Sequence, residues 1–142
     1  MSFDLHPQLA NDTVAVGRLP LCEVLLMNDS QYPWLILVPR VEGAEEAFQL
    51  TEAEQVMLQK ESSAVGREIM ELFAGDKLNI AALGNMVPQL HIHHIVRFRN
   101  DPVWPRPVWG EKPRVAYAPA VLAAMLEQLR AKLSSTSGFI AA

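Results

Sequence analysis

The sequence predicts an α+β domain in which two main helices pack on a mostly antiparallel sheet. Two observations predict this fold. Short apolar runs of strand length alternate with longer segments of helical periodicity, and their order along the chain is strands, helix, strands, helix. The chain has 142 residues, of which 50% are hydrophobic and 20% are charged, and this balance is typical of a globular chain with one core. We therefore expect residues 1–142 to form a single domain.

The first predicted strands lie over residues 19–27 and 34–38. Both runs are apolar, and the turn-forming sequence NDSQ at residues 28–31 separates them. Pro39 ends the second run, because proline has no N–H group to donate to a sheet. The polar stretch over residues 1–13 has no such pattern, so we expect it to be a loosely held lead-in.

The longest predicted helix covers residues 51–74. Thr51 can cap its first turn, and Glu54, three residues later, can complete a capping box. Gly75 stands where a C-terminal cap belongs. The apolar residues of this segment recur at the spacing of one helical face, which predicts a buried stripe. They are Leu58, Val65, Ile69, Leu72 and Phe73.

Two more strands and a second helix complete the predicted fold. The strands cover residues 78–83 and 90–98, and residues 84–88 turn between them. The second helix is expected to begin at Pro119, because proline is well tolerated as the first residue of a helix. Its buried stripe consists of Leu122, Met125, Leu126, Leu129 and Leu133.

The composition excludes several classes of protein. The net charge of -4 and the pI near 5.5 argue against a protein that grips nucleic acid through its overall field. No run approaches the ~20 apolar residues of a membrane span, and the N-terminus lacks the pattern of a signal peptide. Cys22 is the one cysteine, so we expect a buried thiol and a reducing compartment. We therefore expect a cytoplasmic protein with no nucleic-acid or membrane partner.

Three of the four histidines lie within four residues, at His91, His93 and His94. Because alternate side chains of a strand share a face, His91 and His93 should point the same way as Gln89, and His94 should point the other way. The face of His94 is otherwise apolar. We therefore expect His94 to be a buried histidine with satisfied hydrogen bonds.

This cluster has three possible interpretations: scattered polar residues on a solvated face, a metal site, or chemistry on a phosphate. Histidine pairs on strands do bind metals, but the nearest acidic residue is Asp101. A neutral imidazole is a good nucleophile, and a neighbouring imidazole or amide can hydrogen-bond phosphate oxygens. We favour the phosphate chemistry because Gly84 and Asn85 precede the strand. Glycine allows close backbone approach to a ligand, and an asparagine amide can donate to phosphate.

At these residues the sequence resembles the histidine triad (HIT) family of nucleotide hydrolases and transferases. The family motif is His-φ-His-φ-His-φ-φ, where φ is apolar, and residues 87–97 of this chain read VPQLHIHHIVR. The second triad histidine corresponds to His91 and the third to His93. Gly84 and Asn85 stand where the family often has Gly-Gln or Gly-Asn. Residues 34–40, WLILVPR, resemble the family's strand that ends in Pro-Lys or Pro-Arg. The resemblance covers roughly residues 20–100 and implies a HIT-like domain.

The resemblance implies a reaction at the α-phosphorus of a dinucleoside polyphosphate or nucleoside phosphoramidate. Nε2 of His91 would attack, and water would then hydrolyse the nucleotidyl-histidine intermediate. His93 would bind the phosphate or assist the leaving group, while Gln89 and Asn85 would orient phosphate oxygens beside Gly84. The step requires no metal or other cofactor. Family members are commonly homodimers, so we expect a homodimer here.

The chain departs from the family pattern at three places. The first triad position is Gln89, whose amide can orient a ligand but cannot carry a positive charge. His94 stands where an apolar residue is usual. Residues 41–43 lack the histidine that often follows Pro-Lys or Pro-Arg. These departures keep open an alternative function, a nucleotide-binding sensor on the same fold with little catalytic turnover.

A proline-rich segment over residues 102–113 contains Trp104 and Trp109. Its four prolines exclude a regular helix or a central strand. The segment can be a loop whose tryptophans close the core, a rim over the ligand site, or a dimer contact, and we favour the dimer contact. Candidates for the wall of a base pocket are Leu21, Val24 and Leu37, although core packing is the commoner role of such residues.

Overall fold

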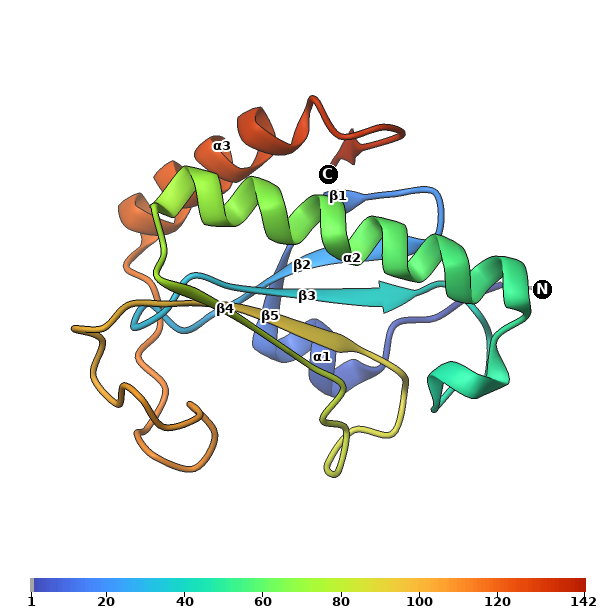
Figure 1. The fold of residues 1–142 in the computed structure, drawn as a ribbon, viewed down its shortest axis with the longest axis horizontal. Coiled ribbons are helices and arrows are strands. Elements are labelled where there is room, and N and C mark those ends of the chain that lie inside the picture. Colours follow the sequence, from blue (N-terminus) through green and yellow to red (C-terminus); the bar gives the residue numbers. More distant parts are fainter. Residues whose placement is uncertain (1) are drawn as a thin grey trace.

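Six antiparallel strands form one sheet in the computed structural model, which describes residues 2–142 (Figure 1). The elements are α1 (Pro7–Asp12), β1 (Thr13–Arg18), β2 (Cys22–Met27), β3 (Trp34–Pro39), the short 3-10 helix η1 (Ala47–Gln49), α2 (Glu52–Phe73), β4 (Lys77–Ala81), β5 (Ile92–Arg97), α3 (Pro119–Leu133) and β6 (Ile140–Ala141). The strand order is β4-β5-β3-β2-β1-β6. This arrangement confirms the predicted α+β class with two main helices.

The chain before residue 13 is not a loose lead-in. Met1 lies outside the described residues, but residues 7–12 form α1, and β1 begins directly after it. The side chain of Leu9 is only 4% exposed. The sequence pattern misses α1 because a six-residue helix is too short to show a helical period.

The long helix α2 begins as the sequence predicts. The hydroxyl of Thr51 accepts a hydrogen bond from the N–H of Glu54 at 3.1 Å, and the Glu54 carboxylate accepts one from the N–H of Thr51 at 2.8 Å. The C-terminal prediction was wrong in detail, because Ala74 rather than Gly75 has the left-handed backbone, with φ 51°. Gly75 is required by packing instead, since a Cβ atom there would lie 2.3 Å from the side chain of Val96.

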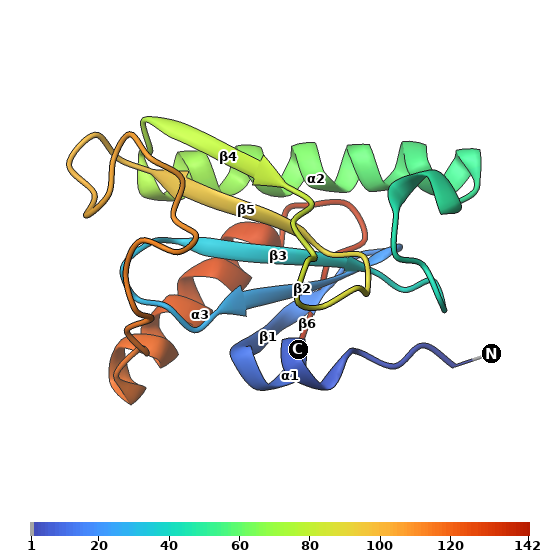
Figure 2. The same ribbon diagram turned by 90° about the horizontal axis from the view of Figure 1, so that it is seen from below.

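The two faces of the sheet carry different layers (Figures 1 and 2). Helices α2 and α3 cover one face, where Val65, Ile69, Leu129 and Leu133 pack against buried residues of the strands. Val24 and Leu37 belong to this helix-covered core, and Leu21 packs against it. The suggestion that these three residues wall a ligand pocket was therefore wrong. Cys22 is fully buried in the same core, as expected.

The opposite face is covered by α1 and two long loops rather than by long helices (Figure 2). Its buried apolar residues come from the strands and from these loops. They are Leu9, Leu25, Tyr32, Trp34, Ile36, Val38, Val87, Ile95, Val103 and Val108. This second core explains why β3 is buried along its whole length, since apolar material lies on both of its sides.

The proline-rich segment over 102–113 closes this second core. Val103 and Val108 are 2% and 5% exposed, and the ring of Trp109 packs edge-on against that of Trp34, with 6.0 Å between centroids. A buried ion pair anchors the start of the segment, with Nε of Arg97 donating to Asp101 at 2.7 Å. Burial alone would raise the pKa of Asp101, but hydrogen bonds from Arg97 and from backbone N–H groups lower it below its usual range.

Within residues 2–142, none of the helices combines the length and the apolar character that crossing a membrane requires.

Candidate active site

His91, His93 and His94 lie on β5, an inner strand of the sheet, and just before it, with their side chains on both faces of the sheet. Strand β5 begins at Ile92, later than predicted, and pairs with β3 and β4, so that His93 lies between Ile36 and Ala81. His93 faces the loop-covered core, and its ring lies 4.9 Å from that of His91. His94 faces the helices. As predicted, His91 and His93 therefore point to one face of the sheet and His94 points to the other.

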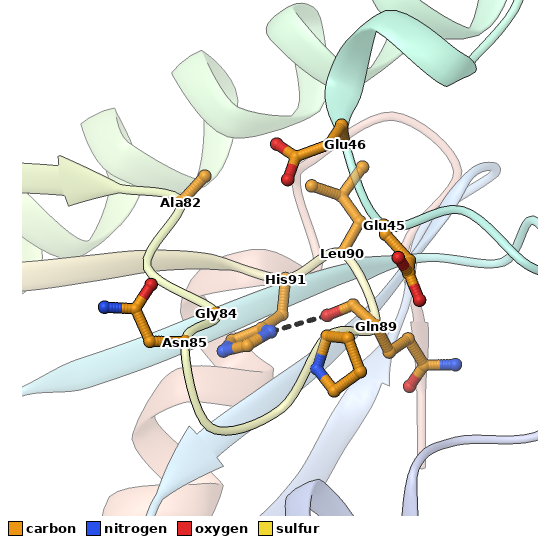
Figure 3. A pocket seen from close by; sticks show the side chains of 9 residues that line it. Glu45, Glu46, Ala82, Gly84, Asn85, Gln89, Leu90 and His91 are labelled. Atoms are coloured by element: carbon orange, nitrogen blue, oxygen red, sulfur yellow. Dashed lines mark hydrogen bonds between the residues drawn. The ribbon is translucent and has the colours of Figure 1, made fainter.

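The ring of His91 is held in one orientation by the backbone just before it. Its Nδ1 lies 2.7 Å from the carbonyl oxygen of Gln89 (Figure 3). A carbonyl oxygen can only accept, so Nδ1 carries the proton in this hydrogen bond. The other nitrogen, Nε2, then has an in-plane lone pair. His91 is 5% exposed, so the nitrogen with the lone pair is held in a mostly enclosed position.

The ring of His93 has the opposite proton arrangement. The indole Nε1 of Trp34 donates to its Nδ1 at 3.0 Å, and its Nε2 lies 3.3 Å from the carbonyl oxygen of Leu83. An indole N–H can only donate, so Nδ1 is the acceptor and Nε2 carries the proton. Burial, together with the nearby His91, lowers the pKa of His93 to about 4. His93 is thus a neutral donor through Nε2 near neutral pH.

Two pockets meet at His91. The first has a volume of about 150 Å³ (Figure 3), and two carboxylates, those of Glu45 and Glu46, lie at it. Its remaining lining residues are Ala82, Gly84, Asn85, Pro88, Gln89, Leu90 and His91. The second is larger, about 510 Å³, and mostly apolar. It is lined by Leu9, Asp12, Met27, Trp34, Leu83, Asn85, Met86, Val87, His91, His93 and Trp109.

Gly84 and Asn85 lie beside the His91 ring, as their position in the sequence suggests. A Cβ atom on residue 84 would lie 2.7 Å from the carbonyl oxygen of Val87 and 3.4 Å from Cε1 of His91. Glycine is therefore needed for the close approach of this loop to the histidine. Asn85 lines both pockets.

Gln89 lies elsewhere than the sequence pattern indicates. It precedes β5 rather than belonging to it, and its side chain points away from the ring of His91 (Figure 3). Its amide oxygen accepts from the N–H of His6 at 2.8 Å, and its amide nitrogen donates to the carbonyl of Asp4 at 2.9 Å. The expected shared face of Gln89, His91 and His93 is therefore not formed. Strand alternation still holds at His91, one residue before β5, but it no longer holds at Gln89.

His94 is a satisfied buried histidine, as predicted. It is 0% exposed, its Nδ1 donates to the carbonyl of Ile92 at 3.0 Å, and its Nε2 accepts from the hydroxyl of Ser62 at 2.7 Å. Burial lowers the pKa of His94 to about 4. This residue joins β5 to α2 and lies behind the candidate site.

Sequence reasoning missed most of the residues that surround His91 and His93; the exception is Trp109, whose segment was offered as a rim over the ligand site and does line the large pocket. Trp34 and Trp109 hold the ring of His93 between them, with centroid distances of 5.7 and 5.2 Å. Leu9 and Asp12 line the large pocket from α1. Trp34 meets His93 across 59 positions of sequence, and Leu9 and Asp12 come from near the start of the chain, so no local pattern marks these three residues. Within residues 2–142, no three His, Cys, Asp or Glu side chains gather as a metal-binding group.

Comparison with known proteins places this geometry in a family. The family model of the HIT domain matches residues 8–100. A histidine triad protein from Marinobacter aquaeolei VT8 is 52% identical over 96% of this chain and 100% of that chain, with a TM-score of 0.93. A histidine triad protein from Bradyrhizobium japonicum is 46% identical over 93% of this chain and 98% of that chain, with a TM-score of 0.90.

A more distant structure shares the fold alone. It is a hypothetical histidine triad nucleotide-binding protein from Sulfolobus tokodaii strain7, which is 17% identical over 89% of each chain, with a TM-score of 0.66. The comparison with curated proteins found no match. From the family match and the two close relatives, we conclude that the chain belongs to the HIT domain family.

Proposed function

We propose that this protein is a nucleotide hydrolase or nucleotidyl transferase that acts at an α-phosphate through a nucleotidyl-histidine intermediate on His91. The HIT family includes nucleotide hydrolases, nucleotidyl transferases and nucleotide-binding proteins. The proposed substrates are of the dinucleoside polyphosphate or nucleoside phosphoramidate type. The proposed catalytic residues are His91 and His93, with Gln89 acting on the His91 ring through its backbone carbonyl, and the proposed phosphate-binding residues are Gly84, Asn85 and His93.

The observation that carries this proposal is the hydrogen bond from Nδ1 of His91 to the carbonyl oxygen of Gln89. It leaves the lone pair on Nε2, so Nε2 is the attacking atom. As Nε2 bonds to the α-phosphorus, the phosphorus bond to the leaving group breaks. Water then attacks the same phosphorus, the bond to Nε2 breaks, and the nucleotide is released. The Gln89 carbonyl stabilises the positive charge that the ring carries while Nε2 is bonded to phosphorus.

His93 can supply a neutral hydrogen-bond donor to the phosphate. Its Nε2–H meets the Leu83 carbonyl at 3.3 Å, which is longer than an ordinary hydrogen bond of this type. A phosphate oxygen can therefore replace that acceptor at little cost. The amide of Asn85, which lines both pockets, is a second candidate donor. Donors aimed at developing charge typically contribute about 10²-fold or more each to the rate.

A nucleotide sensor is the second candidate function, and one observation favours it. The Gln89 amide is engaged by Asp4 and His6 rather than turned toward His91. With that amide engaged, fewer donors face the phosphate than in a complete histidine triad. Such a protein would bind a nucleotide and turn it over slowly.

A release assay separates the two functions. The protein is incubated with diadenosine polyphosphates and adenosine phosphoramidates, and release of mononucleotide is followed beside calorimetric binding. The enzyme proposal expects release by the wild-type protein and a fall to less than about a tenth in His91→Ala, with thermal melting unchanged. Binding without release by the wild-type protein identifies a sensor and contradicts the enzyme proposal.

We also propose that residues 1–142 act as one HIT-like domain and that this domain forms a homodimer. The tryptophan segment over 102–113, which the sequence favours as the dimer contact, is used largely to cover its own core. Strand β4, however, is an outer strand of the sheet, and Ile80 on it is 50% exposed. An uncovered edge strand offers unpaired backbone groups to a second chain.

A further inference from the structure

The N-terminal segment over residues 2–6 is fastened to the rest of the fold at one side chain. Among the hydrogen bonds of residues 2–142, the two that join this segment to a part of the chain beyond α1 both go to Gln89. They run from the N–H of His6 to the amide oxygen, at 2.8 Å, and from the amide nitrogen to the carbonyl of Asp4, at 2.9 Å. An amide suits both, because it accepts and donates at once.

This segment leads directly into one wall of the large pocket. Phe3 and Leu5 pack against the loop-covered core, and Leu9 and Asp12 of α1 line the pocket that contains His91 and His93. Elsewhere α1 is held by the buried side chain of Leu9 and, at its last residue, by the N–H of Asn28, which donates to the carbonyl of Asp12 at 3.0 Å. Among the hydrogen bonds of the described residues, those to Gln89 are the ones that hold the chain just before α1.

We propose that Gln89 is a positioning residue that holds the N-terminal segment against the histidine loop and so keeps Leu9 in the wall of the large pocket. The inference rests on the proposed function in one respect, which is that this pocket holds the nucleoside part of the ligand. The inference explains in structural terms why glutamine rather than histidine stands at position 89. The imidazole of Gln89→His cannot accept from His6 and donate to Asp4 with the same spacing, so that substitution loosens the segment.

The attachment can be tested from both of its sides with variants that keep the shape of the chain. Gln89→Met preserves the length of the side chain and removes its donor and its acceptor. His6→Pro removes the N–H donor on the other side, and the backbone φ of His6, -55°, already suits proline. His6→Ala is the matched control, because it also loses the imidazole that caps α1 at Gln8 but keeps the N–H.

Two measurements are made on the full chain. The first is hydrogen exchange of the peptide over residues 5–12, which reports the attachment without any ligand. The second is the dissociation constant of AMP by calorimetry, for each variant and for the double variant of Gln89→Met and His6→Pro. Thermal melting confirms that each variant is folded.

The proposal expects faster exchange and roughly fivefold to tenfold weaker AMP binding in Gln89→Met and in His6→Pro, with His6→Ala closer to wild type. The double variant should be no worse than Gln89→Met alone, because Gln89→Met already removes the hydrogen bond that His6→Pro removes. Unchanged exchange in Gln89→Met would overturn the proposal. Additive losses of AMP binding would also overturn it, since Gln89 would then act on the ligand itself. If the wild-type protein does not bind AMP, the proposed function fails, and exchange alone decides the role of Gln89.

Discussion

The indole N–H of Trp34 donates to Nδ1 of His93 over 3.0 Å and thereby fixes which nitrogen of that ring carries the proton. The two residues are 59 positions apart in the sequence and meet because β3 and β5 are neighbours in the sheet. The bond holds His93 as a donor through Nε2, the atom nearer to the Leu83 carbonyl. A tryptophan in the core thus sets the chemical state of a candidate active-site residue.

We predict that Trp34→Phe keeps the aromatic packing but no longer fixes which ring nitrogen of His93 carries the proton. The buried Nδ1 loses its donor, which costs about 1–3 kcal/mol in folding free energy, and turnover falls. Nitrogen chemical shifts of the His93 ring measure the effect, changing from one tautomer to a mixture. Trp109→Phe is the matched control, because Trp109 packs against the same ring edge-on. An unchanged tautomer in Trp34→Phe would show that the indole does not set it.

We predict that Gly84→Ala damages turnover more than stability. The added Cβ would lie 2.7 Å from the Val87 carbonyl, so the loop must shift, and the ring of His91 lies next to it. A displacement of about 1 Å at a reacting group can cost about 10²-fold in rate. Steady-state kinetics and melting curves check this, with Ala124→Ser on the exposed side of α3 as the control. Equal turnover in Gly84→Ala and Ala124→Ser would refute it.

We predict that folding stability falls as the pH is lowered from about 6.5 toward 4. The pKa values of His93 and His94 are lowered to about 4 in the folded protein, whereas an unfolded histidine titrates near ~6.5. Between these two pKa values the unfolded chain binds more protons than the folded one. The stabilising contribution is therefore complete above the pKa of the unfolded histidine and is lost progressively as the pH falls toward the pKa of the folded one. At about pH 5, each of the two histidines lowers the free energy of unfolding by on the order of 2 kcal/mol relative to neutral pH.

Urea unfolding at about pH 7 and about pH 5 measures this loss. The variant His94→Gln removes one buried titrating ring and should lose less stability between the two pH values than the wild type does. His6→Gln, outside the buried cluster, is the control. The same pH dependence in His94→Gln and wild type would rule out His94 as a source of the effect.

We predict a homodimer at micromolar concentration that uses the β4 edge. Placing a charge on an exposed apolar residue of that strand, as in Ile80→Lys, should shift the protein toward the monomer. Val121→Lys, on α3 and similarly exposed at 54%, should not. Sedimentation measures both. A wild-type species of the 15.8 kDa chain mass would be incompatible with the dimer.

The sequence allowed the fold class, the long helix and the placement of the three histidines to be predicted, because each depends on local periodicity. The capping box at Thr51 and Glu54 formed for the same reason. The surroundings of the site could not be predicted this way. Gln89 was assigned to a strand face, yet it lies before the strand and bonds to residues 83 and 85 positions away. Such contacts follow from how strands and loops assemble, and a single sequence carries no local signal for them.

The most direct test of His91 as the nucleophile is the isolation of a nucleotidyl group on its ring. The protein is mixed with a dinucleoside polyphosphate, quenched within milliseconds in alkaline denaturant, in which phosphohistidine-type bonds survive, and analysed by intact mass and then by peptide mapping. We predict a transient adduct of one nucleoside monophosphate group, localised to His91 by fragmentation of the peptide that also contains His93 and His94, and its absence in His91→Ala. Turnover without any adduct, or an adduct on His93 or His94 instead, would contradict it.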